Sequence, residues 1–353
     1  MSEVEVAGPV APEASRPGAR AATRRRLIGL AVLLGLLVVV TVASLGIGAN
    51  PISPGHVWSA LIHGGDSIEA GIVRDQRVPR TVLGLIVGGA LALAGALMQG
   101  VTRNPLADPG LLGVSAGSSL AVVLGVGYLS VSPTGPAITW LALAGAAVTS
   151  VVVYGLGARG SAASGPARLA LAGAAVTAAL LSVVRGISLL EPRIFDTLRF
   201  WVVGSLGGRP LGVAWQIAPF VAVGVLLAAV LARGLNTLAL GDDLARALGA
   251  RPGLVRAGGA LAVVLLSGAA TAACGPIVFV GLVVPHAVRA VTGPDQRWIL
   301  PYSLLAGPVL LLGADIIGRV VAPPSEIGVG ICVAVIGAPM FIALVRRRRL
   351  AAL

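Results

Sequence analysis

Ten long apolar stretches, separated by short polar segments, account for most of this chain. The hydrocarbon core of a bilayer is about 30 Å thick, and an α-helix needs roughly 20 apolar residues to cross it. The stretches lie at residues 27–49, 81–101, 111–129, 136–157, 168–190, 211–232, 257–273, 275–292, 299–321 and 327–345. This pattern predicts an all-α integral membrane protein with about ten transmembrane helices.

The eighth stretch, residues 275–292, has the weakest signal because Pro276, Pro285 and His286 interrupt it. Such breaks are tolerated where neighbouring helices or a cavity satisfy the freed backbone groups. Nine crossings are therefore an alternative to ten. Pro285 and His286 are candidates for a hinge or for the lining of a pathway. The alternative is a helix-breaking histidine with local hydrogen bonds.

The polar segments divide the chain into one transmembrane domain, residues 27–345, and two basic tails. Residues 1–26 are expected to form a disordered tail, and residues 346–353 form the second tail. The apolar run after Arg26 is too long for the hydrophobic region of a signal peptide, so it is interpreted as the first transmembrane helix.

Three connecting segments are long enough to hold structure, and they lie at residues 50–79, 191–210 and 233–256. Within the second of them, residues 197–203 include Phe200 and Trp201. Aromatic side chains are enriched at membrane surfaces. We therefore expect this part to form a short amphipathic segment at the level of the lipid headgroups.

Composition and charge support a membrane location. Only 11% of the 353 residues are charged and 56% are hydrophobic, whereas soluble domains are about 25% charged. The formal net charge of +12 comes from arginines that flank the apolar runs, which does not indicate nucleic-acid binding. With both termini in the cytoplasm, 18 of the 26 arginines fall on the cytoplasmic side, as the positive-inside rule requires. Residues 50–79 and 191–210 are then outside, and residues 233–256 are inside.

Candidate chemistry within the spans is sparse. Placing a charged side chain at the bilayer centre costs about 2.5–3.5 kcal/mol. No Asp or Glu lies in the middle of a predicted span, and Asp315 lies toward the end of the ninth span. Cys274 and Cys332 lie in apolar stretches and are expected to be small buried side chains rather than a disulfide or metal site. We expect no catalytic residue, no bound metal and no cofactor.

The chain contains no lysine. A Walker A loop uses a lysine to reach the phosphates of ATP. We therefore expect that this chain does not hydrolyse ATP itself, and that any ATPase is a separate subunit.

Three groups of motifs occur in order along the chain. The first group is Arg77-Val78-Pro79-Arg80, followed after the second span by Arg103-Asn104-Pro105-Leu106. The second group is residues 241–249. The third group begins with Gly275-Pro276-Ile277 and includes Val284-Pro285-His286-Ala287-Val288-Arg289 and Ala314-Asp315-Ile316-Ile317-Gly318-Arg319. Their order and spacing closely resemble the FecCD (BtuC-like) permeases. These are ATP-binding-cassette (ABC) importers of iron–siderophores, haem or cobalamin. The resemblance covers about residues 50–345.

The resemblance implies a type II ABC importer permease fold in the cell membrane, with cytoplasmic termini. It implies a homodimer or heterodimer of permeases, two ATPase subunits that bind ATP and Mg, and an extracytoplasmic substrate-binding protein. Residues 195–206 look most similar to subunits of catecholate-siderophore importers, so a ferric siderophore is the expected substrate. Haem and cobalamin remain alternatives.

The resemblance also implies roles for individual residues. Arg77, Arg80 and Arg319 match positions that dock the binding protein; the alternative is that they extend to lipid headgroups. Asn104, Pro105 and Leu106 match part of a cytoplasmic gate. The segment expected to couple to the ATPase comprises Gly241, Asp242, Asp243, Leu244, Ala245, Arg246, Leu248 and Gly249.

Two rival functions make different demands on the sequence. An ion-coupled secondary transporter needs ionisable residues in the membrane, and the spans lack central carboxylates. A membrane anchor of a redox enzyme needs paired histidines for haem, which His56, His63 and His286 do not supply.

Overall fold

The computed structural model describes residues 17–64, 67–132, 135–158 and 165–346, and these residues form helices and no strands. The predicted all-α class is therefore confirmed for this part of the chain. The α-helices are α1 (Pro17–Gly46), α2 (Pro54–Ile62), α3 (Ile68–Gly71), α4 (Val78–Thr102), α5 (Val114–Tyr128), α6 (Pro136–Ala158), α7 (Gly165–Leu190), α8 (Pro192–Val203), α9 (Leu211–Ala239), α10 (Asp242–Ala247), α11 (Pro252–Cys274), α12 (Val280–Thr292), α13 (Gln296–Val321) and α14 (Val329–Arg346). A π-helical segment, Ile72–Arg77, joins α3 to α4, and a 3₁₀-helix spans Pro109–Leu112.

Each predicted apolar stretch coincides with a helix. In the described residues, seven helical segments are long and apolar enough to cross a membrane, and α5, α12 and the apolar part of α14 are shorter apolar helices. The break in the eighth stretch is confirmed, because residues 275–279 precede α12 without helical structure and Phe279 has a positive φ of 70°. The number of complete crossings stays a prediction.

Helix α1 begins ten residues earlier than the first predicted span. Pro17 is compatible with a first helical turn, and the alanines and arginines that follow are strong helix formers. The expectation that residues 17–26 are disordered is therefore wrong. Residues 1–16 and 347–353, which make up most of the two predicted tails, lie outside the described residues.

The predicted outer segment 50–79 holds α2 and a helical extension of α4. The hydroxyl of Ser67 accepts a hydrogen bond from the Ala70 N–H and so caps the start of α3. Pro79 has no N–H to donate to the carbonyl of Asp75, and the π-helical segment lies directly before it. The wider turn lets the helix continue, and Arg77 and Arg80 are thereby held on its buried face.

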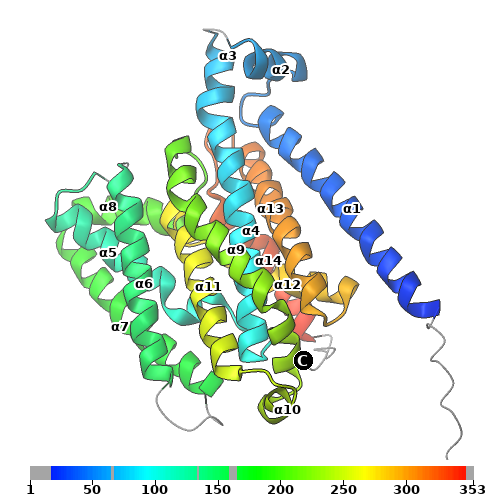
Figure 1. Ribbon diagram of the computed structural model, residues 1–353. Coiled ribbons are helices and arrows are strands. Elements are labelled where there is room, and N and C mark those ends of the chain that lie inside the picture. The colour runs from blue at the N-terminus through cyan, green and yellow to red at the C-terminus, as the bar shows by residue number, and fades with distance from the viewer. Residues whose placement is uncertain (1–16, 65–66, 133–134, 159–164, 347–353) are drawn as a thin grey trace, which may run out of the picture.

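Helix α4 runs through the middle of the bundle, with α9 and α11 on one side and α13 on the other (Figure 1). Small residues allow its neighbours to approach closely. A Cβ added to Gly95 would lie 1.8 Å from the Gly281 carbonyl oxygen of α12. One added to Gly88 would lie 2.7 Å from the backbone of Pro308 in α13. At both positions the neighbouring backbone therefore leaves no room for a side chain, and glycine is required.

The bundle has two distinct ends. Helices α2 and α3 lie at one end, called the outer end here, and α10 lies at the opposite or inner end (Figure 1). Helix α1 begins and α14 ends at the inner end (Figure 1). That the inner end faces the cytoplasm is the prediction made from the arginine distribution.

The segment predicted to lie at the membrane surface is helix α8, but its tryptophan is not at the surface. Trp201 is buried in an apolar cluster with Ile194 and Leu198 of α8 and Val122 of α5. Trp201 therefore faces the protein interior, while the level of α8 at the membrane surface stays a prediction. The aromatic pattern could not reveal this, because its burial depends on packing against α5, which is distant in sequence.

Candidate functional site

At the outer end, Arg80 of α4 makes an ion pair with Asp315 of α13. The Arg80 Nε atom donates to Asp315 Oδ2 at 2.9 Å, and Nη2 donates to Oδ1 at 2.8 Å. Arg319, one turn after Asp315, approaches Oδ2 at 3.2 Å. Asp315 has no exposed surface, so one buried carboxylate serves two guanidinium groups. The remaining edge of Arg80 is used by Glu326, whose Oε2 lies 2.5 Å from Nη1.

Arg77 closes the carboxyl end of α1. Its Nη1 atom donates to the carbonyls of Leu45 at 2.8 Å and Gly46 at 2.7 Å, and its Nη2 atom donates to the carbonyl of Asn50. The last carbonyls of a helix have no partner within the helix and carry partial negative charge. A guanidinium group is therefore a well-matched cap.

Arg319 caps the same helix end from α13. Its Nη1 atom donates to the carbonyls of Ser44 and Ile47, both at 2.9 Å. Its Nη2 atom donates to the Ser44 hydroxyl at 2.9 Å, and that hydroxyl also contacts Thr81 of α4 at 2.8 Å. The ends of α1, α4 and α13 are thus joined by one polar network.

The three arginines expected to dock a binding protein are brought together by the fold. Arg77, Arg80 and Arg319 are only 5%, 8% and 2% exposed. The alternative that they extend to lipid headgroups is wrong, because their guanidinium groups bind carbonyls and carboxylates of this chain. Their docking role stays a prediction.

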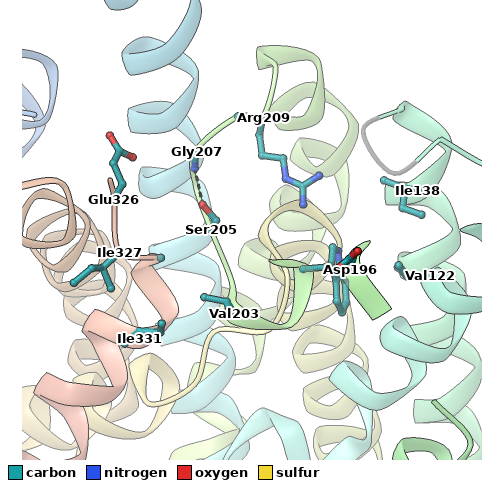
Figure 2. Close-up of a pocket in the computed structure, with 13 residues that line it drawn as sticks. Val122, Ile138, Asp196, Val203, Ser205, Gly207, Arg209, Glu326, Ile327 and Ile331 are labelled. Atoms are coloured by element: carbon teal, nitrogen blue, oxygen red, sulfur yellow. Dashed lines mark hydrogen bonds between the residues drawn. The ribbon is translucent and has the colours of Figure 1, made fainter. Parts of the chain in front are cut away.

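Two cavities open beside this cluster. A cavity of about 460 Å³ is lined by the three arginines, Glu326 and Asn50, among others. A larger cavity, of about 820 Å³, lies between α8, the start of α9 and the start of α14, with Glu326 and Ile327 on one side and Asp196 and Arg209 across from them (Figure 2). The two cavities share the wall made by Ser205, Gly207, Gly208 and Glu326.

At the inner end, Asp242 fixes the short helix α10. Both of its carboxylate oxygens accept hydrogen bonds from Arg256 of α11, at 2.7 and 2.8 Å. Arg103, which ends α4 in the left-handed conformation, lies 3.4 Å from the same carboxylate. The hydrogen bonds from Arg256 and the charges of Arg103 and Arg246 lower the pKa of Asp242.

Within the expected coupling segment, Asp242–Ala247 form the short helix α10, and three leucines in and beside this helix are exposed. Leu240, Leu244 and Leu248 are four residues apart, and each is exposed. Gly241 and Gly249 adopt positive φ values of 100° and 79° and so allow the chain to turn at both ends of the helix. The inner connection is shorter than the predicted residues 233–256, because α9 continues to Ala239 and α11 begins at Pro252, and it still contains all of residues 241–249.

The residues expected to form a gate follow directly after Arg103. Asn104 Oδ1 accepts a hydrogen bond from the Leu106 N–H at 2.9 Å, which closes a tight turn around Pro105. Leu106 is exposed. The turn is thus next to the contact between α4 and α10, while its role as a gate stays a prediction.

Pro285 in α12 leaves the carbonyl of Gly281 without its usual helical donor. Gln99 of α4 donates to this carbonyl at 3.4 Å and to that of Leu282 at 3.3 Å, and its own oxygen accepts from Arg289 at 3.2 Å. His286 does not supply the local hydrogen bond considered above, because its buried Nδ1 has no partner among the described residues. Helix α12 therefore continues through Pro285, and Gln99 of α4 satisfies the carbonyl that the proline leaves free.

The sequence assigned no role to Asp315, Glu326, Arg103 or Arg256, and it did not reveal their contacts with the assigned residues. Asp315 and Arg319 have the spacing of a helical ion pair, a signal that could have linked them. Asp242, Arg103 and Arg256 could not be connected by pattern, because they lie on three separate helices. Glu326 lies in the connection before α14 and has no distinguishing pattern.

Cys274 and Cys332 are buried, as predicted. Within the described ranges, no group of three or more His, Cys, Asp or Glu residues is arranged to hold a metal ion.

Comparison with known proteins agrees with this architecture. A family model described as the FecCD transport family matches residues 36–347. The chain is 47% identical over 323 residues to the ferric enterobactin transport system permease protein FepD of Escherichia coli strain K12, covering 92% of this chain and 96% of that protein. It is 38% identical over 321 residues to YfiZ of Bacillus subtilis strain 168, a probable siderophore transport system permease protein. This match covers 91% of this chain and 96% of that protein.

Among solved structures, the fold is similar to an inward-facing conformation described as that of a metal-chelate type ABC transporter. The TM-score is 0.78 at 27% sequence identity, and the likeness covers 90% of this chain and 98% of the other. The similarity therefore extends over nearly the whole bundle.

Proposed function

The chain belongs to the FecCD transport family, and from this premise we propose that it is the membrane-spanning permease subunit of an ABC importer for a ferric siderophore. It is a multi-pass membrane protein with the fold of an ABC transporter permease. The observation that carries the substrate class is the near-full-length likeness to a ferric enterobactin permease. Like its relatives, it acts as a transport subunit rather than as an enzyme.

The permease works within a transporter complex that contains other permease and ATPase subunits. In the proposed assembly, this chain pairs with a second permease subunit, either a copy of itself or a related chain, and two ATPase subunits bind ATP and Mg. No cofactor is assigned to this chain. The charge pattern supports the orientation, with α10 and the gate turn on the cytoplasmic side.

The inner end offers a surface suited to an ATPase subunit. Leu244 of α10 and the nearby Leu240 and Leu248 are exposed, and burying exposed apolar side chains against a partner is favourable. Asp242 joins α10 to α4 and α11 through Arg103 and Arg256. Movement of the ATPase subunits is thereby transmitted to α4 and α11 in the bundle core. Residues 104–106 follow the end of α4, so a gate at this turn would move with that helix.

The outer end offers a surface suited to an acidic side chain of a substrate-binding protein. Three arginines meet two carboxylates in the cluster, which leaves one positive charge in excess beside an open cavity. Charge complementarity favours encounter with an acidic partner and fixes its orientation. Substrate released by the docked protein would enter near the larger cavity.

The proposed substrate is tested by growth and uptake. A strain lacking this chain is supplied with radioactive iron bound to a catecholate siderophore, a hydroxamate siderophore, citrate or haem. The proposal predicts loss of uptake for the catecholate complex alone and recovery when the chain is restored. Unchanged catecholate uptake, with loss of haem uptake instead, would overturn the substrate class.

A further inference from the structure

In the part of the chain that the structure describes, two carboxylates contact the outer arginines. Their side chains differ in solvent exposure. The side chain of Asp315 has no exposed surface, whereas that of Glu326 is 39% exposed. Asp315 comes from the rigid helix α13, and Glu326 comes from the connection between α13 and α14. Asp315 is therefore a fixed part of the cluster, and Glu326 is the carboxylate that can leave it.

Glu326 uses the one edge of Arg80 that Asp315 does not. Arg80 Nε and Nη2 face Asp315, while Nη1 faces Glu326 Oε2 at 2.5 Å. Arg77 and Arg319 are committed to the carbonyls at the end of α1. An incoming carboxylate that approaches from the 460 Å³ cavity would therefore compete with Glu326 for the Nη1 edge of Arg80.

We propose that Glu326 occupies the place of an acidic side chain of the substrate-binding protein, and that docking displaces Glu326 from Arg80. This inference rests on the proposed function, because it requires an acidic partner at the outer end. Glu326 acts as a built-in competitor. It satisfies Arg80 when no partner is docked and weakens the docked complex by the cost of its release.

Displacement of Glu326 has a consequence within the permease. Glu326 is part of the wall shared by the two outer cavities (Figure 2). The next residue, Ile327, donates its N–H to the Gly318 carbonyl of α13 at 3.0 Å, and α14 begins at Val329. Release of Glu326 therefore loosens the shared wall next to the start of α14, which lines the larger cavity.

The test compares docking affinities in the assembled transporter. The complex of this chain with its partner permease and ATPase subunits is purified in nanodiscs. Binding of the cognate substrate-binding protein is measured by biolayer interferometry. A partly exposed ion pair contributes up to about 1 kcal/mol, so E326Q is expected to tighten docking by about fivefold. E326D, which keeps the charge but is one methylene shorter, is expected to tighten it to a smaller degree.

Glu69 supplies a matched control, because it is another exposed glutamate of the outer end and contacts His56 rather than the arginine cluster. E69Q removes the same charge and is expected to change the affinity by less than twofold. Equal tightening in E69Q and E326Q would show a general charge effect and overturn the inference. Unchanged or weaker docking in E326Q would overturn it as well.

The outcomes separate this inference from the proposed function. If the wild-type complex binds the protein and E326Q binds it equally well, the importer assignment stands and the competitor role is wrong. If the wild-type complex does not bind the substrate-binding protein either with or without siderophore, the importer assignment and the competitor role are both wrong. Copurification of all subunits with E326Q establishes that the variant has assembled.

Discussion

Arg103 at the inner end of α4 lies 3.4 Å from the carboxylate of Asp242 in α10. The outer end of the same helix holds Arg80 against Asp315. Helix α4 is deeply buried between its neighbours, so it links the outer cluster to the segment proposed to contact the ATPase. A helix of this length, held at both ends by charged contacts, is well suited to transmit movement across the bundle.

Replacing Asp242 by asparagine is expected to uncouple ATP hydrolysis from transport. The substitution removes the negative charge that holds Arg256 and Arg103, so α10 loses its fixed position relative to α4 and α11. We expect uptake in proteoliposomes to fall by about tenfold, corresponding to about 1.4 kcal/mol, while the ATPase subunits still copurify and hydrolyse ATP.

Asp243 provides the control for this change. It lies next to Asp242, but its side chain is fully exposed and pairs only with Arg246 among the residues described. D243N is expected to keep at least half of the wild-type transport. Equal loss of transport in D242N and D243N would contradict a specific role for Asp242.

The contribution of Asp242 to stability is expected to depend on pH. Its pKa is lowered in the folded chain by the hydrogen bonds from Arg256 and by the neighbouring arginines. The stabilisation is therefore fully present above the unfolded pKa of about 3.9 and is lost as pH falls through the lower folded value. The difference in thermal midpoint between wild type and D242N should stay constant from pH 7 to about pH 5 and shrink below pH 4. A difference that grows on acidification would have the wrong sign.

Replacing Asp315 by asparagine is expected to destabilise the outer end strongly. It leaves the buried guanidinium groups of Arg80 and Arg319 without their shared counter-charge. Breaking a buried ion pair by removing one partner costs about 3–5 kcal/mol. Thermal unfolding in detergent, followed by tryptophan fluorescence, should show a clearly lower midpoint. A midpoint equal to wild type would show that the arginines find other partners.

Replacing Gly95 by alanine is expected to disturb the contact between α4 and α12. The added methyl group would lie 1.8 Å from the Gly281 carbonyl oxygen, so the two backbones must separate. We expect lower expression and a lower thermal midpoint. Gly35 in α1 is the control, because a Cβ there meets nothing within 4 Å, and G35A should behave as wild type. A G95A variant as stable as G35A would contradict this packing.

The positions of the helices were largely predictable, because each span must place a long apolar run in the bilayer. The three arginines were also identifiable as unusual charges. Their burial was not predictable, because Arg80 meets Asp315 from 235 residues away and Arg319 meets the Ser44 carbonyl from 275 residues away in the chain. Pattern indicates which side chains are unexpected in a membrane protein, whereas only the fold shows which carbonyls and carboxylates they meet.

The most direct test of the central claim is transport by the purified complex. The chain is reconstituted into liposomes with its partner permease, ATPase subunits and binding protein, and uptake of a ⁵⁵Fe-loaded catecholate siderophore is followed with ATP or with a proton gradient. The account predicts uptake that requires ATP and is unaffected by an uncoupler. Uptake driven by the proton gradient in the absence of ATP would contradict it.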